Sequence, residues 1–354
     1  MKKILSIALS AVMAGTAALA CTGCDSQPKE EINVFNWGEY VSNGEDGTLD
    51  TIAEFEERYN VKVNYTNYES NEEMYNLLKE SNSSYDVIIP SDYMISKLIE
   101  EDMLEKINFD NVPNYKNIMD KYKTTDFDPN GEYSVPYSWG VVALCYNKTM
   151  VEEKPTGFDV LWDKDYSGNI LMFNNSRDAM AIAMKLKGIT PTTVTKDDID
   201  VATKYLSEQK PLLKKYVMDQ VFTEMEGDQA ALAPYYAGDI AVMMTNNENL
   251  DYVLPEEGSN LFIDSMCIPK TTQNKELAEK FINYMLDAEV AKANAEYLGY
   301  STPNQAAYEL LDDEVKNNEL IYPSDEYLSK CYTFSDLPQD VYDYMQNEFL
   351  KVQL

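Results

Sequence analysis

The sequence predicts an α/β fold in which a parallel sheet carries helices on its faces. Short apolar runs typical of strands alternate with longer amphipathic stretches typical of helices, and this alternation continues through both halves of the chain. Strands joined by helices pair in parallel, because each helix returns the chain to the same end of the sheet. The length of 354 residues is sufficient for two such domains.

The first half of the chain shows the alternation most clearly. Leu49, Ile52 and Phe55 recur every three residues, as the apolar face of a helix does. Ser91 follows a strand-like run and is expected to cap a helix that extends to Leu98. The other expected elements of this half are strands at 32–35, 61–65 and 85–89 and helices at 49–58 and 72–79.

The second half repeats the pattern with longer helices. The last expected helix is amphipathic, and Gly299 is expected to end it, because glycine readily adopts the left-handed conformation that closes helices. The expected elements are strands near 141–147, 169–173, 240–244 and 261–268 and helices near 178–187, 197–208 and 275–298.

The start of the chain predicts an exported protein. Two lysines precede an apolar run of small residues that ends at Cys21 and Cys24, which is typical of a lipoprotein signal peptide. The run is shorter than the roughly 20 apolar residues of a membrane span. We therefore expect residues 1–23 to be a signal peptide and Cys24, or alternatively Cys21, to carry the lipid. Residues 24–31 are expected to be a polar tether, with the remaining chain outside the cytoplasmic membrane.

The charge of the chain favours cationic partners. There are 61 acidic against 29 basic side chains, a net charge of −32. Most of these carboxylates serve solubility. Nucleic acid is excluded as a partner, because phosphate binding requires clustered lysines and arginines, and the sequence has no basic stripe.

Histidine is absent from the sequence. This excludes Ser-His-Asp and Cys-His nucleophilic catalysis, histidine zinc sites and imidazole acid–base chemistry. Cys145 and Cys267 lie in apolar strand-like runs and are expected to be buried core residues, not disulfide or metal ligands. No metal and no other cofactor is expected.

Aromatic and acidic side chains follow several of the expected strands. In parallel sheets, ligands bind beyond the carboxyl ends of the strands. Trp37, Glu39 and Tyr40 form one such group, and two rings beside a carboxylate suit an amine ligand; a capped loop whose rings pack on the core is the equal alternative. The positions selected in this way are 37–40, 91–93, 174–178 and 262–264.

Several longer segments then form a recognisable set. In order, they include Val34-Phe35-Asn36-Trp37-Gly38-Glu39-Tyr40, Tyr85-Asp86-Val87-Ile88-Ile89-Pro90-Ser91-Asp92-Tyr93, Ser134-Val135-Pro136-Tyr137-Ser138-Trp139-Gly140, Asp264-Ser265 and Gly299-Tyr300-Ser301-Thr302-Pro303-Asn304. Through these segments the chain resembles the spermidine/putrescine-binding lipoproteins of polyamine ABC importers over nearly all of its mature length.

The resemblance implies a two-lobed, periplasmic-binding-protein-like fold of type II. Each lobe would be a mainly parallel sheet flanked by helices, and two hinge crossings would join the lobes. The implied ranges are 32–139 plus 263–308 for the first lobe and 140–262 plus 309–354 for the second.

The resemblance also implies a ligand site in the cleft between the lobes. The aromatic wall falls on Trp37, Tyr40, Tyr93 and Tyr300. Ser91 and Glu39 are implied polar neighbours, and Asp264 is the principal carboxylate.

The chain departs from the family pattern at four positions of this site. Asn175 stands where the family has an aspartate, Asp178 where it has a glutamate, and Phe262 where it has a tryptophan. A further family tryptophan falls near Asn246, where this chain has no aromatic residue. Spermidine, putrescine and another small amine all remain open as the ligand.

The implied function is a binding protein without catalysis. Its partners would be a polyamine, the permease subunits of an ABC transporter and the membrane through the lipid anchor, and the protein would be a monomer. Two alternatives stay open. Paired carboxylates could serve a glycan-cleaving enzyme that needs no histidine, and the same cleft could serve a sensor.

Overall fold

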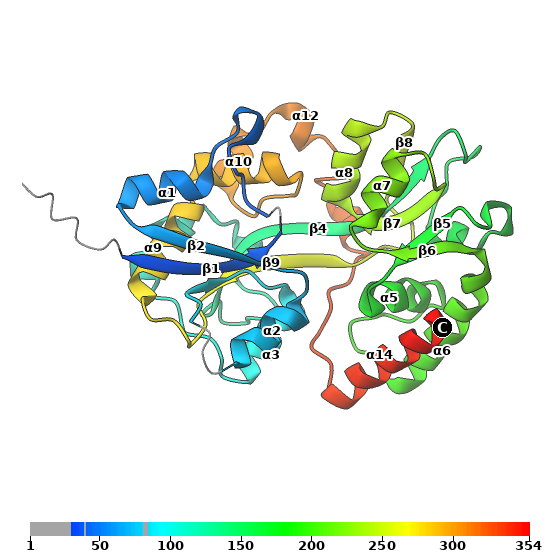
Figure 1. Ribbon diagram of the computed structural model, residues 1–354, viewed down its shortest axis with the longest axis horizontal. Coiled ribbons are helices and arrows are strands. Elements are labelled where there is room, and N and C mark those ends of the chain that lie inside the picture. Colours follow the sequence, from blue (N-terminus) through cyan, green and yellow to red (C-terminus); the bar gives the residue numbers. More distant parts are fainter. Residues whose placement is uncertain (1–29, 39, 81–83) are drawn as a thin grey trace, which may run out of the picture.

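The structure is a computed structural model, shown in Figure 1, that describes residues 30–38, 40–80 and 84–354. The expected signal peptide with its lipidation candidates Cys24 and Cys21 lies outside the described residues, and so does Glu39. The first strand begins at Glu31, the last residue of the expected tether. In the described part of the chain, no helix combines the length and apolar character needed to cross a membrane.

One sheet of nine strands runs through the described part of the molecule. The strand order is β2-β1-β3-β9-β4-β7-β5-β6, and β8 pairs with β4. The bounds are β1 Glu31–Trp37, β2 Lys62–Tyr68, β3 Val87–Ile88, β4 Ser134–Asn147, β5 Ile170–Phe173, β6 Leu213–Val217, β7 Leu232–Tyr236, β8 Leu250–Val253 and β9 Leu261–Cys267.

The sheet is parallel at its two ends and antiparallel at its centre. At one end β1 pairs in parallel with β2 and β3, and at the other β5 pairs in parallel with β6 and β7. Between them, β4 and β9 are antiparallel to each other and to their neighbours. The predicted parallel pairing is therefore correct for the ends and wrong for the centre, where two strands run in opposite directions between the halves.

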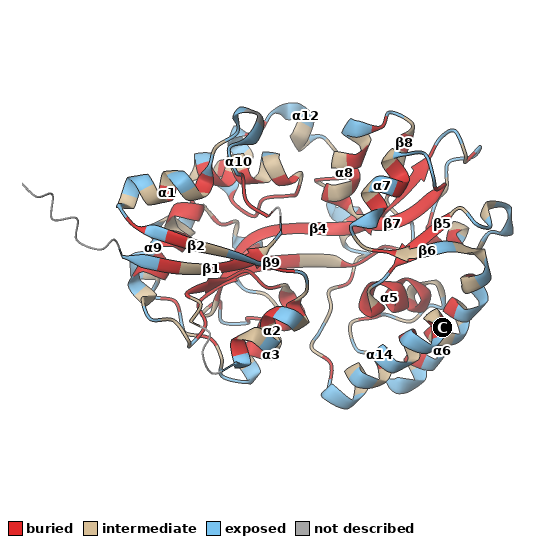
Figure 2. Cartoon of the chain, in the orientation of Figure 1, coloured by how far each residue is buried: buried red, intermediate tan, exposed pale blue. Residues whose placement is uncertain are grey.

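These two central strands connect the halves of the molecule (Figure 1). The first part of β4, Ser134–Val141, pairs with β9, and its second part, Val142–Asn147, pairs with β7 or β8. All of β4 is buried, as Figure 2 shows, because both faces are covered by other elements. A strand that is buried on both faces has a nearly continuous apolar sequence, without the alternation of apolar and polar residues.

Helices cover both halves of the sheet, with their buried faces inward and exposed faces outward (Figure 2). Among them α5 is buried almost throughout. The bounds are α1 Thr51–Tyr59, α2 Asn71–Lys79, α3 Asp92–Glu100, α4 Asp120–Lys123, α5 Ser176–Leu186, α6 Lys196–Gln209, α7 Gln220–Glu226, α8 Ala237–Asn246, α9 Lys275–Met285, α10 Ala288–Leu298, α11 Gln305–Leu310, α12 Asp313–Lys316, α13 Asp325–Leu328 and α14 Gln339–Gln353.

The buried apolar side chains form two separate cores. The first core gathers residues from 32–139 and 263–300, and the second gathers residues from 141–253 and 320–352. The boundary between the two cores falls at residue 140, within β4. Each core is thus built from segments that are distant in sequence, and β4 and β9 extend from one core into the other.

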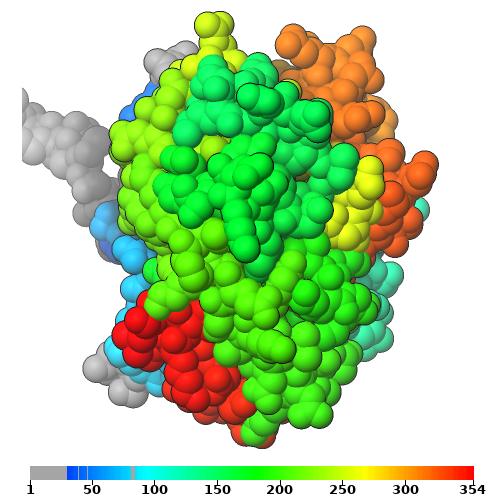
Figure 3. Space-filling view, turned by 90° about the vertical axis from the view of Figure 1, so that its right-hand side faces the viewer, coloured from blue at the N-terminus to red at the C-terminus, as the bar shows by residue number. Residues whose placement is uncertain are grey.

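The C-terminal part of the chain adds a third connection. After α11, which packs on α10, the chain enters the second core at Leu320. The segment before α14 then runs between the two halves (Figure 1), where Phe334 packs against the first core and Leu337 lies in the second. Figure 3 looks onto the outer face of the second core, where α14, in red, lies against the green helical segment that includes α6.

Two predicted elements are wrong. Residues 240–244 are helical, within α8, and the strand lies just before them at β7. The run Ile-Ala-Val-Met-Met is too short for its periodicity to separate a buried strand from a buried helix. The long helix expected at 275–298 is two helices, α9 and α10, because Asp287 caps a new helix by accepting a hydrogen bond from the backbone of Glu289.

Other expected features are confirmed. The helices expected in the first half and at 178–187 and 197–208 are present within a few residues of their predicted bounds. Gly299 ends α10 with a φ of 68°. Cys145 and Cys267 are buried in β4 and β9. Ser91 is the residue before α3, although its side chain makes no capping hydrogen bond there.

Candidate ligand-binding site

Asp264 lies on the crossing strand β9, at the boundary of the first core. Its carboxylate is 5% exposed, and the Tyr40 hydroxyl donates a hydrogen bond of 2.6 Å to its Oδ2. The backbone of Asp264 also pairs with that of Ser91, which follows β3. Among the described residues its Oδ1 has no hydrogen-bond partner. The structure thus brings three predicted site residues together and leaves one acceptor free.

Asp178 occupies the matching position in the second core. It lies in the first turn of α5, whose N-cap is Asn175; the Asn175 side chain accepts hydrogen bonds from the backbone of Arg177 and Asp178 at 2.9 and 3.4 Å. The Tyr236 hydroxyl donates to Asp178 Oδ2 at 2.9 Å. The carboxylate is 4% exposed, and its Oδ1 has no partner within the described chain. Asn175 therefore caps the helix that carries Asp178.

A third carboxylate joins the two halves directly. Tyr300, which follows α10, donates a hydrogen bond of 3.0 Å to Oδ2 of Asp239 in α8. Tyr300 belongs to the first core, and Asp239 lies between residues of the second. This contact crosses from one half to the other.

A chain of aromatic rings connects these carboxylates. The ring centroids of Tyr40 and Tyr300 are 6.2 Å apart, those of Tyr300 and Phe262 5.8 Å, and those of Phe262 and Tyr236 5.7 Å, all in edge-to-face geometry. In edge-to-face contacts the positive edge of one ring lies against the negative face of the other. The rings extend from the Tyr40–Asp264 pair to the Tyr236 that binds Asp178.

Burial raises the pKa of all the acids in this region. Removal from water disfavours the charged carboxylate, which raises the pKa of Asp264 and Asp178 to about 6. Tyr40 and the Ser91 side chain oppose this rise at Asp264, and Tyr236 and the charge of Arg177 oppose it at Asp178. Burial likewise raises the pKa of Asp239 to about 7 and that of Asp92, beside Ser91, to about 8. A bound cation would favour the charged forms and reverse this shift.

Two glycines allow the Tyr300 ring to lie against the backbone. A Cβ on Gly238 would lie 2.6–2.7 Å from three atoms of the ring, and one on Gly140 would lie 2.8 Å from Phe262 and 3.1 Å from Tyr300. Contacts below 3.0 Å require a ring to move, and the hydrogen bond of the Tyr300 hydroxyl to Asp239 opposes movement of the Tyr300 ring.

Gly238→Ala is therefore expected to destabilise the protein by about 1–2 kcal/mol, since the displaced ring costs more than alanine gains in helix propensity. Chemical denaturation measures the difference in unfolding free energy. Gly38→Ala is the control, because a Cβ there meets nothing within 4 Å; equal changes in the two variants would contradict this account of the Tyr300 contact.

The remaining predicted residues lie at the edges of this cluster. Trp37, at the end of β1, donates its indole N–H to the Ile89 carbonyl at 2.9 Å, and its ring lies 4.7 Å from that of Tyr68. The Tyr93 ring faces Arg177, whose guanidinium carbon lies 3.8 Å from the ring centroid. The structure thus places both aromatic residues nearby but gives each a partner within the protein.

Two residues of this region, Tyr236 and Asp239, were missed by the sequence analysis. Asp92 and Arg177 lie within the selected ranges 91–93 and 174–178 but were not named as site residues. Tyr236 ends β7 and lies in the cluster, whereas Asn246, near which a family aromatic was expected, is exposed at the far end of α8 and donates to Glu226. The rule that ligands lie at strand ends would have selected Tyr236 and Asp239, had the strand been placed at 232–236.

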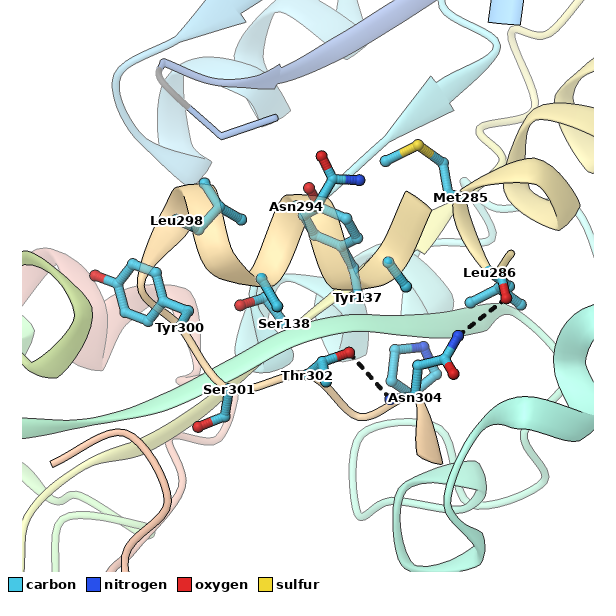
Figure 4. A pocket seen from close by; sticks show the side chains of 13 residues that line it. Tyr137, Ser138, Met285, Leu286, Asn294, Leu298, Tyr300, Ser301, Thr302 and Asn304 are labelled. Carbon is cyan, nitrogen blue, oxygen red and sulfur yellow. Dashed lines mark hydrogen bonds between the residues drawn. The ribbon is translucent and has the colours of Figure 1, made fainter. Parts of the chain in front are cut away.

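A pocket beside the cluster differs from it in chemistry. Figure 4 shows Tyr300 at one end of this pocket, which lies between β4, α10 and residues 300–304. Asn304 there donates to the Leu286 carbonyl at 3.0 Å. The lining residues include no acid, so this pocket lacks the charge that an ammonium group requires. The acids and rings described above form the better candidate site.

The family of the chain follows from comparison with known proteins. The family model for bacterial extracellular solute-binding proteins matches residues 50–323. The chain belongs to this family. Among curated relatives, the spermidine/putrescine-binding periplasmic protein of Salmonella typhimurium is 33% identical over 319 residues, covering 90% of each chain. That of Escherichia coli K12 is also 33% identical, over 88% of this chain and 89% of the relative.

Solved structures confirm the expected fold. The spermidine/putrescine transporter substrate-binding protein PotD of Streptococcus pneumoniae superposes with a TM-score of 0.81 at 33% identity, covering 92% of this chain and 99% of that one. A putative spermidine/putrescine transporter protein of Listeria monocytogenes gives 0.86 at 34%, with the same coverage. The fold is the mixed α/β fold of periplasmic binding proteins.

Proposed function

We propose that this protein captures a polyamine between its two halves and delivers it to the permease of an ABC importer. The observation that carries the proposal is a pair of buried carboxylates, Asp264 and Asp178, one from each half, each with one oxygen that has no hydrogen-bond partner among the described residues. Burial of such groups is unfavourable unless a cation or hydrogen-bond donor compensates it. An ammonium group at each oxygen supplies a positive charge and a hydrogen-bond donor.

The aromatic rings suit the rest of such a ligand. Tyr300, Phe262 and Tyr236 lie between the two carboxylates along one contact chain. Ring faces pack on methylene groups and attract a nearby cation, by about 0.5–2 kcal/mol each. Charge-assisted hydrogen bonds add about 1.5–3 kcal/mol each. A flexible chain of methylenes with an ammonium at each end uses both kinds of contact.

The names of the relatives agree with this chemistry, since those cited above are polyamine-binding proteins of bacteria. We propose the same role here, as a binding protein and not an enzyme. The two cores support the division into lobes at 32–139 plus 263–308 and 140–262 plus 309–354, with ligand capture closing one lobe on the other.

The family also supports a location outside the cytoplasmic membrane, because its members are described as extracellular. We further propose that Cys24 is lipidated, which anchors the protein to the membrane, and that the protein acts as a monomer. Mass spectrometry of the mature protein tests the anchor: a lipid-modified N-terminal Cys24 is expected, and an unmodified N-terminus or one at Cys21 would contradict it.

Calorimetric titration with putrescine and spermidine tests the function. Saturable one-to-one binding of a polyamine is expected, with lysine and thiamine as negative controls. If neither polyamine produced heat or raised the melting temperature, the proposal would be wrong, and other small organic cations would be the next ligands to test.

A further inference from the structure

The hydrogen bond between Tyr300 and Asp239 is a direct contact between the two halves of the molecule. Tyr300 follows α10 and packs in the first core, whereas Asp239 lies in the first turn of α8, between residues of the second core. Both groups of this bond belong to the protein, so the attraction that it provides between the halves does not depend on a ligand.

The backbone is built to bring this pair together. Gly299 ends α10 with a φ of 68°, and a Cβ there would lie 3.3 Å from the Gly238 carbonyl oxygen in α8. A Cβ on Gly238 would in turn lie 2.6–2.7 Å from three atoms of the Tyr300 ring. The end of α10 and the start of α8 therefore approach closely, because a glycine stands on each side of the contact.

The two partners are fixed to different halves. Next to Tyr300, the backbone of Ser301 exchanges hydrogen bonds with that of Trp139 in the first core, at 3.1 and 3.2 Å. Asp239 lies in α8, which packs in the second core through Ile240. A hydrogen bond is lost when its two heavy atoms separate beyond about 3.5 Å. A small rotation of one half against the other is therefore sufficient to break this bond.

The pair is shielded from water where the halves meet. Tyr300 is 8% exposed, and burial raises the pKa of Asp239 to about 7. A polar group that is buried without a partner is unfavourable. Each group of the pair therefore makes the burial of the other less unfavourable, and both are buried together only when the halves are in contact.

We propose that Tyr300 and Asp239 form a latch that stabilises the closed arrangement of the two halves before a ligand binds. The unliganded protein then exchanges between an open and a closed form, and the ligand enters the open one. A single hydrogen bond of this kind shifts such an equilibrium by about tenfold, so the latch favours closure without making it permanent. Asp239 is thus a positioning residue that acts through Tyr300. This inference goes beyond the proposed function, because it concerns the protein without ligand.

Small-angle X-ray scattering of the unliganded protein tests the latch. Tyr300→Phe keeps the ring and removes the hydroxyl, and Asp239→Ala removes the acceptor; each is expected to have a larger radius of gyration than the wild type. The double variant is expected to be no more expanded than the larger of the two single variants, because both substitutions remove the same bond. Asp239→Asn keeps an acceptor oxygen and should stay closer to the wild type than Asp239→Ala does.

The chain offers a matched control in Tyr344 of α14, which donates a hydrogen bond of 2.6 Å to Asp200 of α6 within the second half. Tyr344→Phe should leave the radius of gyration unchanged. If Tyr300→Phe were as compact as the wild type, or if the expansions of the two single variants added up in the double variant, the inference would be overturned.

Calorimetry gives a second readout, which rests on the proposed function. Tyr300→Phe is expected to bind putrescine and spermidine at least threefold more weakly than the wild type, by the same factor for both, because the hydroxyl contacts Asp239 and not the ligand. A loss confined to one polyamine would overturn the latch, since it would make the hydroxyl a ligand contact. If the wild type bound neither polyamine, the proposed function would be wrong, whereas expansion of the unliganded variants would still support the latch.

Discussion

Replacing Asp264 by asparagine is expected to weaken putrescine binding at least tenfold, about 1.4 kcal/mol. The amide keeps the size of the side chain and can still accept the hydrogen bond from Tyr40, which is 2.6 Å long in the wild type. The substitution removes the negative charge of a buried carboxylate that lies beside the chain of aromatic rings. Calorimetry on the wild type and the variant measures the loss.

A second Tyr–Asp pair serves as the control. Tyr146 donates a hydrogen bond of 2.9 Å to Asp251 on the edge strand β8, outside the candidate site. Asp251→Asn makes the same chemical change and should leave the affinity within about twofold, about 0.4 kcal/mol. Equal losses in both variants, or unchanged binding in Asp264→Asn, would remove Asp264 from the site.

The affinity for polyamine is expected to fall as the pH is lowered from 8 to 5. Asp264 and Asp178 have a pKa raised to about 6 by burial, so both carry protons at the lower pH and must lose them to bind a cation. Each such group costs about tenfold in affinity at pH 5, so the two together cost about a hundredfold. Titrations in buffers of different ionisation enthalpy should also show proton release.

The same carboxylates make the unliganded protein less stable as the pH is raised, whereas they make its binding of polyamine tighter. An acid whose pKa is raised by folding contributes stability below its unfolded pKa and loses that contribution as the pH rises through the folded value. The wild type should therefore lose more stability between pH 5 and 8 than Asp264→Asn does, while the shift in melting temperature produced by putrescine grows. A ligand-induced shift that is the same at pH 5 and pH 8 would contradict the assignment of these acids to the site.

The sequence predicted the parallel ends of the fold more accurately than its centre. Helices such as α1 and α6 have an apolar face at regular spacing, which local periodicity detects. The strands β4 and β9 belong to both halves, and their antiparallel pairing depends on residues more than a hundred positions apart. No local pattern encodes that pairing, and only the family resemblance implied the crossings.

The site shows the same division between local and long-range information. Tyr40, Asp264 and Asp178 were selected from motifs and strand ends, and the structure gives each a defined place. Asp239 was missed because the run after it was interpreted as a strand. The Arg177–Tyr93 contact could not be predicted, because it arises only when two helices from different halves meet.

A crystal structure of the protein grown with putrescine would show whether Asp264 and Asp178 hold the ligand. We expect one ammonium group within hydrogen-bond distance of Asp264 Oδ1 and the other within hydrogen-bond distance of Asp178 Oδ1, with the methylenes along Tyr300, Phe262 and Tyr236. Putrescine bound instead in the acid-free pocket between β4 and α10 (Figure 4), or at the surface with both carboxylates unoccupied, would contradict it.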